Sequence, residues 1–91
     1  MENLITLDKL NVGQRAIIVK INTQETPIKR RILDMGLTKG TEVVIIKIAP
    51  LGDPVQILVR GYSLSIRKEE LSKIECLVLQ KNKEEERFNG I

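Results

Sequence analysis

Few acidic side chains in this sequence are placed to do acid–base chemistry, which needs a titratable pair in a cleft. The candidates are Asp34, Asp53, Glu69 and Glu70. Glu69 and Glu70 are adjacent on a predicted surface turn, where we expect both carboxylates to be solvated. Asp53 is interpreted as a turn residue whose carboxylate accepts backbone N–H bonds. These residues therefore do not predict an enzyme.

The chain has one cysteine, Cys76, and no histidine. This composition excludes an intramolecular disulfide, a thiolate zinc cluster and any site or catalytic scheme that needs imidazole. Because Cys76 lies within an apolar alternation, we expect a buried, structural thiol. Ferrous iron is usually held by imidazole together with carboxylate. We therefore expect neither a tight metal site nor a required cofactor, and a weak site made of carboxylates alone stays open.

The sequence contains neither of the glycine motifs that cradle phosphates, the P-loop and the dinucleotide fingerprint. Gly36 and Gly40 lie in the stretch MGLTKGT, between a predicted helix end and a predicted strand start. A phosphate cradle needs the opposite order, in which a strand leads into a helix. We interpret Gly36 as a helix cap and Gly40 as part of the following turn.

Length and composition indicate one small globular domain that is rich in strands. The chain has 91 residues, of which 42% are hydrophobic and 30% charged, and its apolar residues are mostly Ile, Leu and Val. No stretch approaches the ~20 apolar residues that cross a bilayer, and the opening MENLITLDKL lacks the features of a signal peptide. We therefore expect a cytoplasmic protein that reaches the inner face of the membrane only through a partner.

The net charge of +3 has its densest source in the cluster Lys29, Arg30 and Arg31. Such a cluster can attract nucleic acid, anionic lipid or an acidic protein surface, or it can be a solvated helix face. Nucleic acid is not expected as a partner, because single strands need aromatic platforms. The chain offers only Tyr62, which is predicted to point inward, and Phe88.

One helix is expected within the stretch NTQETPIKRRILDMGL. Thr26 is a plausible N-cap, and Pro27 fits the first helical position, where its missing N–H is not needed. Gly36 fits the left-handed position just past the helix end, and Leu37 can fold back on the last turn. The arginines and Asp34 lie largely off the apolar stripe of this helix.

The remaining pattern predicts a mainly β fold. Five short strands are expected at 15–21, 41–49, 55–60, 62–66 and 73–79. Short helical turns are expected over 4–10, with Thr6 as a possible N-cap, and over 68–71. In the fourth strand Tyr62, Leu64 and Ile66 should point inward. We predict a small SH3-like barrel with one inserted helix, with an OB-like barrel as the alternative. The domain should span 1–79, followed by a polar, charged tail at 80–91.

The stretch APLGDP between the second and third strands is a rigid turn. Pro50 and Gly52 fit the second and fourth positions of a type I turn, and Pro54 can begin the next strand. Gly61 supplies the following hairpin turn. Leu51 lies at the tip, where it either contacts a partner or folds back over the barrel mouth. An apolar turn tip beside the basic helix with Lys29, Arg30 and Arg31 is a combination that could form a modest protein interface.

Residues 30–70 resemble the FeoA family, the small cytosolic component of bacterial ferrous iron uptake. The family pattern has arginines before a helix end, a Gly-Leu pair, a further glycine, an apolar strand, a Pro-Leu-Gly-Asp-Pro turn and a hairpin. In this sequence the pattern is carried by Arg30, Arg31, Gly36, Leu37, Gly40, the turn 50–54 and Gly61. The resemblance spans roughly residues 7–79.

The resemblance implies an SH3-like fold and a non-catalytic accessory role beside FeoB, a membrane transporter of ferrous iron, through its cytoplasmic GTP-binding part. It also implies transition-metal binding, with Fe²⁺ as the metal, although no residue here points to a site. A metal-sensing regulator and a nucleic-acid-binding barrel are the alternatives. An arginine finger in GTP hydrolysis is conceivable for Arg30 or Arg31. The candidate partner-binding residues are Lys29, Arg30, Arg31, Asp34, Leu37, Leu51 and Asp53.

Overall fold

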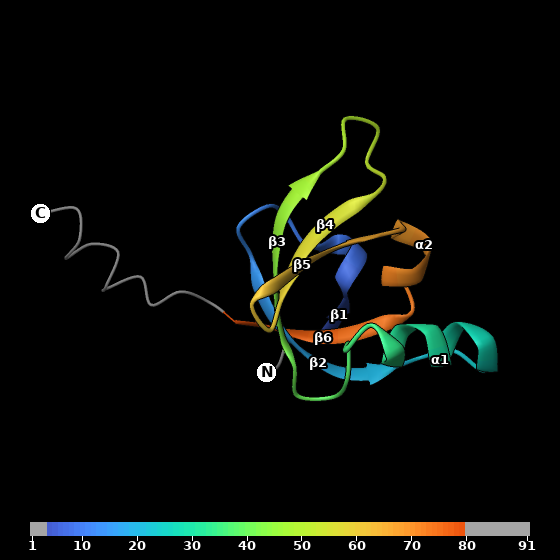
Figure 1. Cartoon of the computed structure of the whole chain (residues 1–91). Coiled ribbons are helices and arrows are strands. Elements are labelled where there is room, and N and C mark those ends of the chain that lie inside the picture. Colours follow the sequence, from blue (N-terminus) through green and yellow to red (C-terminus); the bar gives the residue numbers. More distant parts are fainter. Residues whose placement is uncertain (1–3, 80–91) are drawn as a thin grey trace, which may run out of the picture.

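The computed structural model describes residues 4–79 as one curved sheet with two short α-helices on one side (Figure 1). The strands are β1 (Leu4–Thr6), β2 (Arg15–Ile21), β3 (Glu42–Ile48), β4 (Val55–Val59), β5 (Tyr62–Ile66) and β6 (Ile74–Leu79). The helices are a 3-10 helix (Leu7–Lys9), α1 (Thr26–Asp34) and α2 (Lys68–Leu71). The predicted tail, 80–91, lies outside the described residues.

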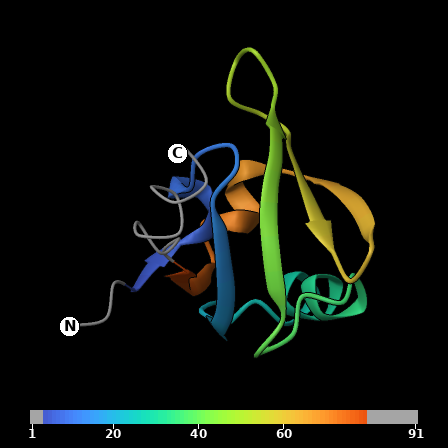
Figure 2. The same ribbon diagram turned by 90° about the vertical axis from the view of Figure 1, so that its left-hand side faces the viewer.

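The strands pair antiparallel in the order β1-β6-β2-β3-β4-β5. The strand β2 lies between β6 and β3, and its residues Arg15, Ala16 and Ile17 pair with both neighbours. The sheet is strongly curled in Figures 1 and 2, with β1 and β5 as its outer strands. The predicted mainly β class is confirmed.

The sheet has six strands and not five, because the N-terminal segment forms a strand of its own. Ile5 lies opposite Cys76, so that β6 satisfies the backbone groups of β1. The helical turn predicted over 4–10 is confined to Leu7–Lys9, and Thr6 makes no side-chain capping bond. Leu7 and Leu10, whose spacing of three residues favoured a helix, are both buried in the core.

The hydrophobic core lies inside the curl of the sheet and beneath α1 and the 3-10 helix. Every element except β1 contributes a buried apolar side chain. These residues are Leu7, Leu10, Ala16, Ile18, Ile32, Leu37, Val43, Ile45, Val55, Ile57, Val59, Ile66, Leu71, Ile74 and Cys76. Burial alternates along β4, where Val55, Ile57 and Val59 are the buried residues.

Tyr62 was predicted to point inward, but it is 43% exposed, so this prediction is wrong. Its hydroxyl donates a hydrogen bond of 2.7 Å to the backbone carbonyl of Met35, at the end of α1. A tyrosine in the interior would need a partner for that hydroxyl, and the helix end supplies one at the surface. β5 is thereby linked to α1.

The helix α1 begins one residue earlier than predicted and ends as predicted. Its N-cap is Glu25, so Thr26 is the first helical residue and makes no capping bond. At the other end Gly36 has a φ of +89°. The Gly36 N–H donates to Leu33 and the Leu37 N–H to Ile32, the paired bonds of a Schellman motif. No helix within residues 4–79 has the length and apolar character needed to span a membrane.

Candidate functional site

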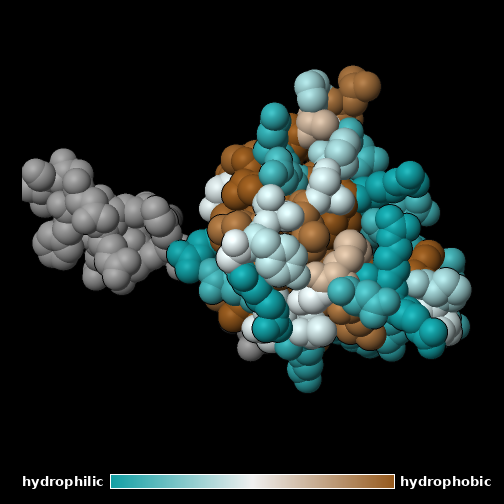
Figure 3. All heavy atoms as spheres, in the orientation of Figure 1, coloured by the Kyte–Doolittle hydropathy of each residue, from teal (hydrophilic) through white to brown (hydrophobic). Residues whose placement is uncertain are grey.

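The connection between β3 and β4 projects beyond the rest of the sheet (Figures 1 and 2). The Gly52 N–H donates to the Ala49 carbonyl at 2.7 Å, which closes the predicted turn, and the Ala49 N–H donates to the Pro54 carbonyl at 3.1 Å. At the tip Leu51 is 97% exposed, and the tip is hydrophobic in Figure 3. The alternative in which Leu51 folds back over the barrel is therefore wrong.

Asp53 braces this loop against α2. Its Oδ1 accepts a hydrogen bond of 2.8 Å from the backbone N–H of Lys68, the first residue of α2. The carboxylate thus accepts a backbone N–H bond as predicted, but from the start of α2 and not from its own turn, where the Gly52 amide bonds the Ala49 carbonyl. The carboxylate instead satisfies one of the N–H groups that a helix start leaves unpaired, and it holds the loop to the body of the domain.

We expect Asp53→Ala to lower the free energy of unfolding by about 1 kcal/mol, the usual effect of losing a helix-capping carboxylate. Urea unfolding measures this change. Asp34→Ala removes an exposed carboxylate from α1 and is the matched control, with an expected change within about 0.5 kcal/mol. Equal losses in the two variants would contradict the bracing role of Asp53.

The basic cluster on α1 is exposed, and one of its arginines is paired. Arg31 Nε lies 3.1 Å from Glu70 Oε2, whereas Lys29 and Arg30 form no ion pair within residues 4–79. Glu70 is only 8% exposed, so the expectation that its carboxylate is solvated is wrong, while Glu69 is exposed. A buried carboxylate needs a compensating charge, and Arg31 provides it across the α1–α2 contact.

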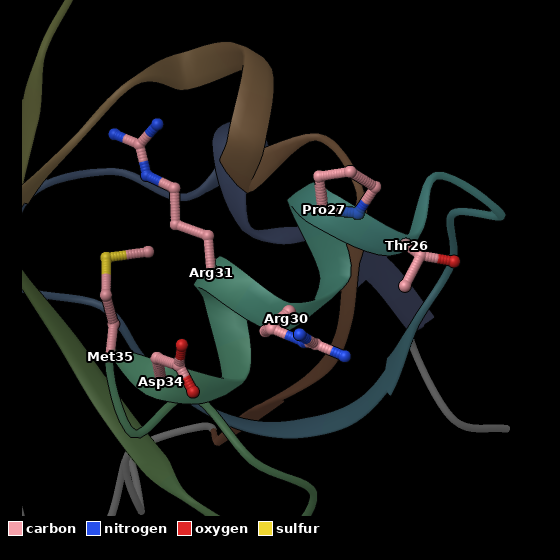
Figure 4. A pocket seen from close by; sticks show the side chains of 6 residues that line it. All are labelled: Thr26, Pro27, Arg30, Arg31, Asp34 and Met35. Carbon is pink, nitrogen blue, oxygen red and sulfur yellow. The ribbon is translucent and has the colours of Figure 1, made fainter.

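An open groove of about 530 Å³ runs along this side of α1 (Figure 4). Arg31 and Met35 project to the same side of the helix, and Asp34 lies beside Met35 near the helix end. The groove is lined by Thr26, Pro27, Arg30, Arg31, Asp34 and Met35. Its mixed charge and open shape suit contact with a protein surface better than enclosure of a small ligand.

The predicted site residues fall into two groups. Leu51 and Asp53 belong to the β3–β4 loop, and the four charged candidates 29–31 and 34 belong to α1. The helix α2 links the groups, because it bonds Asp53 at its start and pairs with Arg31 through Glu70. Leu37 belongs to neither group, since it is 0% exposed and lies in the core. It is not available to a partner.

The donor groups in residues 4–79 do not fit a resident transition metal. No three His, Cys, Asp or Glu side chains in that range lie close enough to hold an ion. Cys76 is fully buried, and burial, followed by the charge of Asp8, raises the pKa of its thiol to about 11. The thiolate that a metal would bind is therefore disfavoured. Asp8 Oδ1 is buried without a hydrogen-bond partner in the described range, but one such oxygen beside a protonated thiol does not form a metal site.

The Cys76 thiol predicts a loss of stability in alkaline solution. Its pKa rises from 9.0 to about 11 in the folded protein, so between these values the unfolded chain binds fewer protons. The free energy of unfolding therefore falls as the pH rises from 9.0 toward 11. We expect a shallower fall in Cys76→Ala, measured by denaturant unfolding across this range. Identical slopes in the two proteins would mean that another group is responsible.

The family model of the FeoA domain matches residues 5–77. The chain belongs to the FeoA family. A fusion of Fe(2+) transport protein A with the Fe(2+) transporter FeoB from Porphyromonas gingivalis (strain ATCC BAA-308 / W83) is 34% identical over 76 residues. This alignment covers 84% of this FeoA-family chain and 9% of the fusion protein. The chain thus spans only a small part of that relative's length.

Solved structures of FeoA proteins have the same fold. The NMR structure of a FeoA-like protein from Clostridium acetobutylicum has a TM-score of 0.81 and 38% identity, and covers 90% of this chain and 94% of that one. The crystal structure of Stenotrophomonas maltophilia FeoA complexed with zinc has a TM-score of 0.69 and 24% identity, and covers 79% of this chain and 88% of that one. The latter is described as an SH3 domain protein, so the predicted SH3-like architecture is confirmed.

Sequence reasoning missed the side chain of Arg60, which links the β4–β5 turn to the segment between α1 and β3. Arg60 has a φ of 49° in the two-residue turn between β4 and β5, a turn that needs left-handed residues. Its Nη2 donates to Thr41 Oγ1 at 2.8 Å and to Thr38 Oγ1 at 3.2 Å. The Arg60-Gly61 pair between two strands signals the turn, but nothing local signals the bond to the threonines.

Proposed function

We propose that this chain is a non-catalytic accessory and regulatory protein of bacterial ferrous iron uptake that binds the cytoplasmic GTP-binding part of a FeoB-type transporter. The observation that carries the proposal is the tip of the β3–β4 loop. Leu51 is 97% exposed on a loop that is closed by its own hydrogen bonds and braced by Asp53. A preordered apolar side chain binds a pocket with little loss of conformational entropy.

The relative from Porphyromonas gingivalis supports the choice of partner. In that protein a FeoA segment and a FeoB transporter are joined in one polypeptide, and domains fused in one organism are good candidates for contact in another. In our proposal the chain acts in the cytoplasm and reaches the inner face of the membrane through the transporter. It needs no cofactor for this contact.

The α1 helix offers the second part of the proposed interface. Arg30 and Lys29 are exposed and form no ion pair within the described range, so their charges remain available for an acidic surface. Arg31 would have to leave Glu70, 3.1 Å away, before it could act on a bound nucleotide. For this reason we assign Arg31 no part in GTP hydrolysis, and we assign Lys29 and Arg30 a role in binding.

The test is capture of the full-length transporter from solubilised membranes on the immobilised chain, in parallel with GTP, GDP and no nucleotide. We expect retention that depends on the nucleotide. Iron accumulation by cells with and without the protein supplies the functional readout, and we expect lower uptake without it. Absence of capture in every nucleotide state, together with normal uptake, would overturn the proposal.

A further inference from the structure

A second groove lies on the other flank of α1, between this helix and the end of β2. Its volume is about 500 Å³. It is lined by Val19, Lys20, Ile21, Lys29, Leu33 and Lys39. Three of these side chains are apolar and three are lysines, and the predicted site residues include only Lys29. The lining is therefore half apolar and half basic.

The helix contributes one apolar and one basic side chain to this groove. Lys29 and Leu33 are four residues apart on α1, so they lie one above the other on the same helix face. Leu33 is 41% exposed although it is a large apolar residue. Because the buried stripe of α1 is centred on Ile32, Leu33 is left beside the core and open to contact.

The strand contributes three consecutive residues because its ladder is interrupted there. The pairing of β2 with β6 shifts register between Ile18 and Lys20, which leaves Val19 as the bulged residue. A bulge disrupts the alternation of side chains and changes their direction. Val19, Lys20 and Ile21 all line this groove.

Acidic side chains offset the charge of the groove only in part. No acidic side chain lines it, and the ion pairs within residues 4–79 join Arg15 to Glu42 and Arg31 to Glu70. Glu75 lies opposite Lys20 across the ladder and offsets part of its charge, while its Oε2 also accepts a hydrogen bond of 2.9 Å from Asn22 Nδ2. The residues that line the groove thus carry net positive charge beside three apolar side chains.

We propose that this groove binds an acidic peptide segment that carries one or two large aliphatic or aromatic side chains. Apolar anchors would contact Val19, Ile21 and Leu33, and carboxylates beside the anchors would meet the lysines. This combination is the helix-in-groove mode of recognition. A bilayer would present a flat surface to the lysines, and nucleic acid would make no use of the aliphatic side chains. That the transporter supplies the segment rests on the proposed function, whereas the chemistry of the groove does not.

The direct test uses a synthetic helical peptide with glutamates and with leucines spaced at i, i+3 and i+4, titrated into the full chain and followed by amide NMR. We expect shifts confined to β2, α1 and the turn at Lys39. The double variant Lys29→Glu/Lys39→Glu should weaken binding at least tenfold, and Leu33→Asp should do the same. Lys9→Glu changes an exposed lysine on the 3-10 helix and should leave the affinity unchanged.

The other outcomes separate the groove from its alternatives and from the proposed function. Shifts spread over the whole surface, or an equal loss in Lys9→Glu, would mean nonspecific charge attraction. Tighter binding to anionic vesicles than to the peptide, lost in the same double variant, would assign the groove to a lipid surface. The thermal midpoint of each variant verifies that it is folded. Equal capture of the transporter by wild type and by Leu33→Asp would contradict the groove and leave the proposed function standing. Peptide binding without any capture of the transporter would contradict the proposed function and leave the groove standing.

Discussion

Leu51→Asp is expected to weaken binding of the transporter by tenfold or more while leaving the domain fully folded. Burial of one leucine side chain at an interface contributes about 1.5–3 kcal/mol, and each 1.4 kcal/mol corresponds to a factor of about ten in affinity. An aspartate at the same place would also bring a charge into an apolar pocket. Because Leu51 is 97% exposed in the free protein, its replacement removes almost no contact within the fold.

Two controls make this result specific. Val12→Asp introduces the same acid at another exposed apolar loop position, 58% accessible, and should bind as wild type. Urea unfolding of Leu51→Asp should differ from wild type by no more than about 0.5 kcal/mol, as for most surface substitutions. Unchanged affinity in a folded Leu51→Asp protein would show that the loop tip is not the contact. Equal weakening in both variants would point to a general effect of added negative charge.

Gly36→Ala is expected to be the most destabilising single-methyl change, at about 2–3 kcal/mol. The φ of +89° at Gly36 strains any residue with a Cβ by roughly 1–2 kcal/mol. In addition, the new Cβ would stand 2.6 Å from the Tyr62 hydroxyl. The ring must then move, and its 2.7 Å hydrogen bond to the Met35 carbonyl is lost, which adds about 1 kcal/mol.

Gly40→Ala is the matched control for this prediction. Gly40 has nearly the same φ, +88°, but a Cβ there meets no atom within 4 Å. It should therefore show the backbone strain alone, and its thermal midpoint should lie several degrees above that of Gly36→Ala. In a Tyr62→Phe background the two alanine variants should differ by less, because the contact and the bond are gone. A difference of the same size in both backgrounds would contradict the assigned role of Tyr62.

The parts of the fold that the sequence predicts are those decided by neighbours along the chain. Gly36 and Leu37 end α1 as expected because a helix cap is a local arrangement of a few residues. The turn at 49–52 closes as expected because Pro50 and Gly52 restrict the backbone directly. The strand β1 escaped prediction because three residues carry too little pattern, and only the pairing with β6 gives them their form.

The parts of the candidate site that could not be predicted depend on partners far away in the sequence. Glu70 looked like one acid of a solvated pair until α1 placed Arg31 against it. Asp53 looked like a turn residue because no neighbouring residue in the sequence indicates that its carboxylate bonds the amide of Lys68. The exposure of Leu51 depends on how far the hairpin extends beyond the sheet, which no property of the six-residue turn determines. The groove lined by Lys20, Lys29 and Lys39 was also missed, because it joins residues from β2, α1 and the turn before β3.

The pairing of β1 with β6 bears on how such a domain can be built into larger polypeptides. Leu4 lies opposite Leu77, so the two ends of the described chain leave the sheet side by side, away from the β3–β4 loop (Figure 1). A domain with adjacent ends tolerates insertion and circular permutation well. Covalent attachment there leaves Leu51 free and raises its effective concentration at a neighbouring domain to the order of millimolar. A contact between Leu51 and the neighbouring domain that is too weak to persist between separate chains would then be formed most of the time.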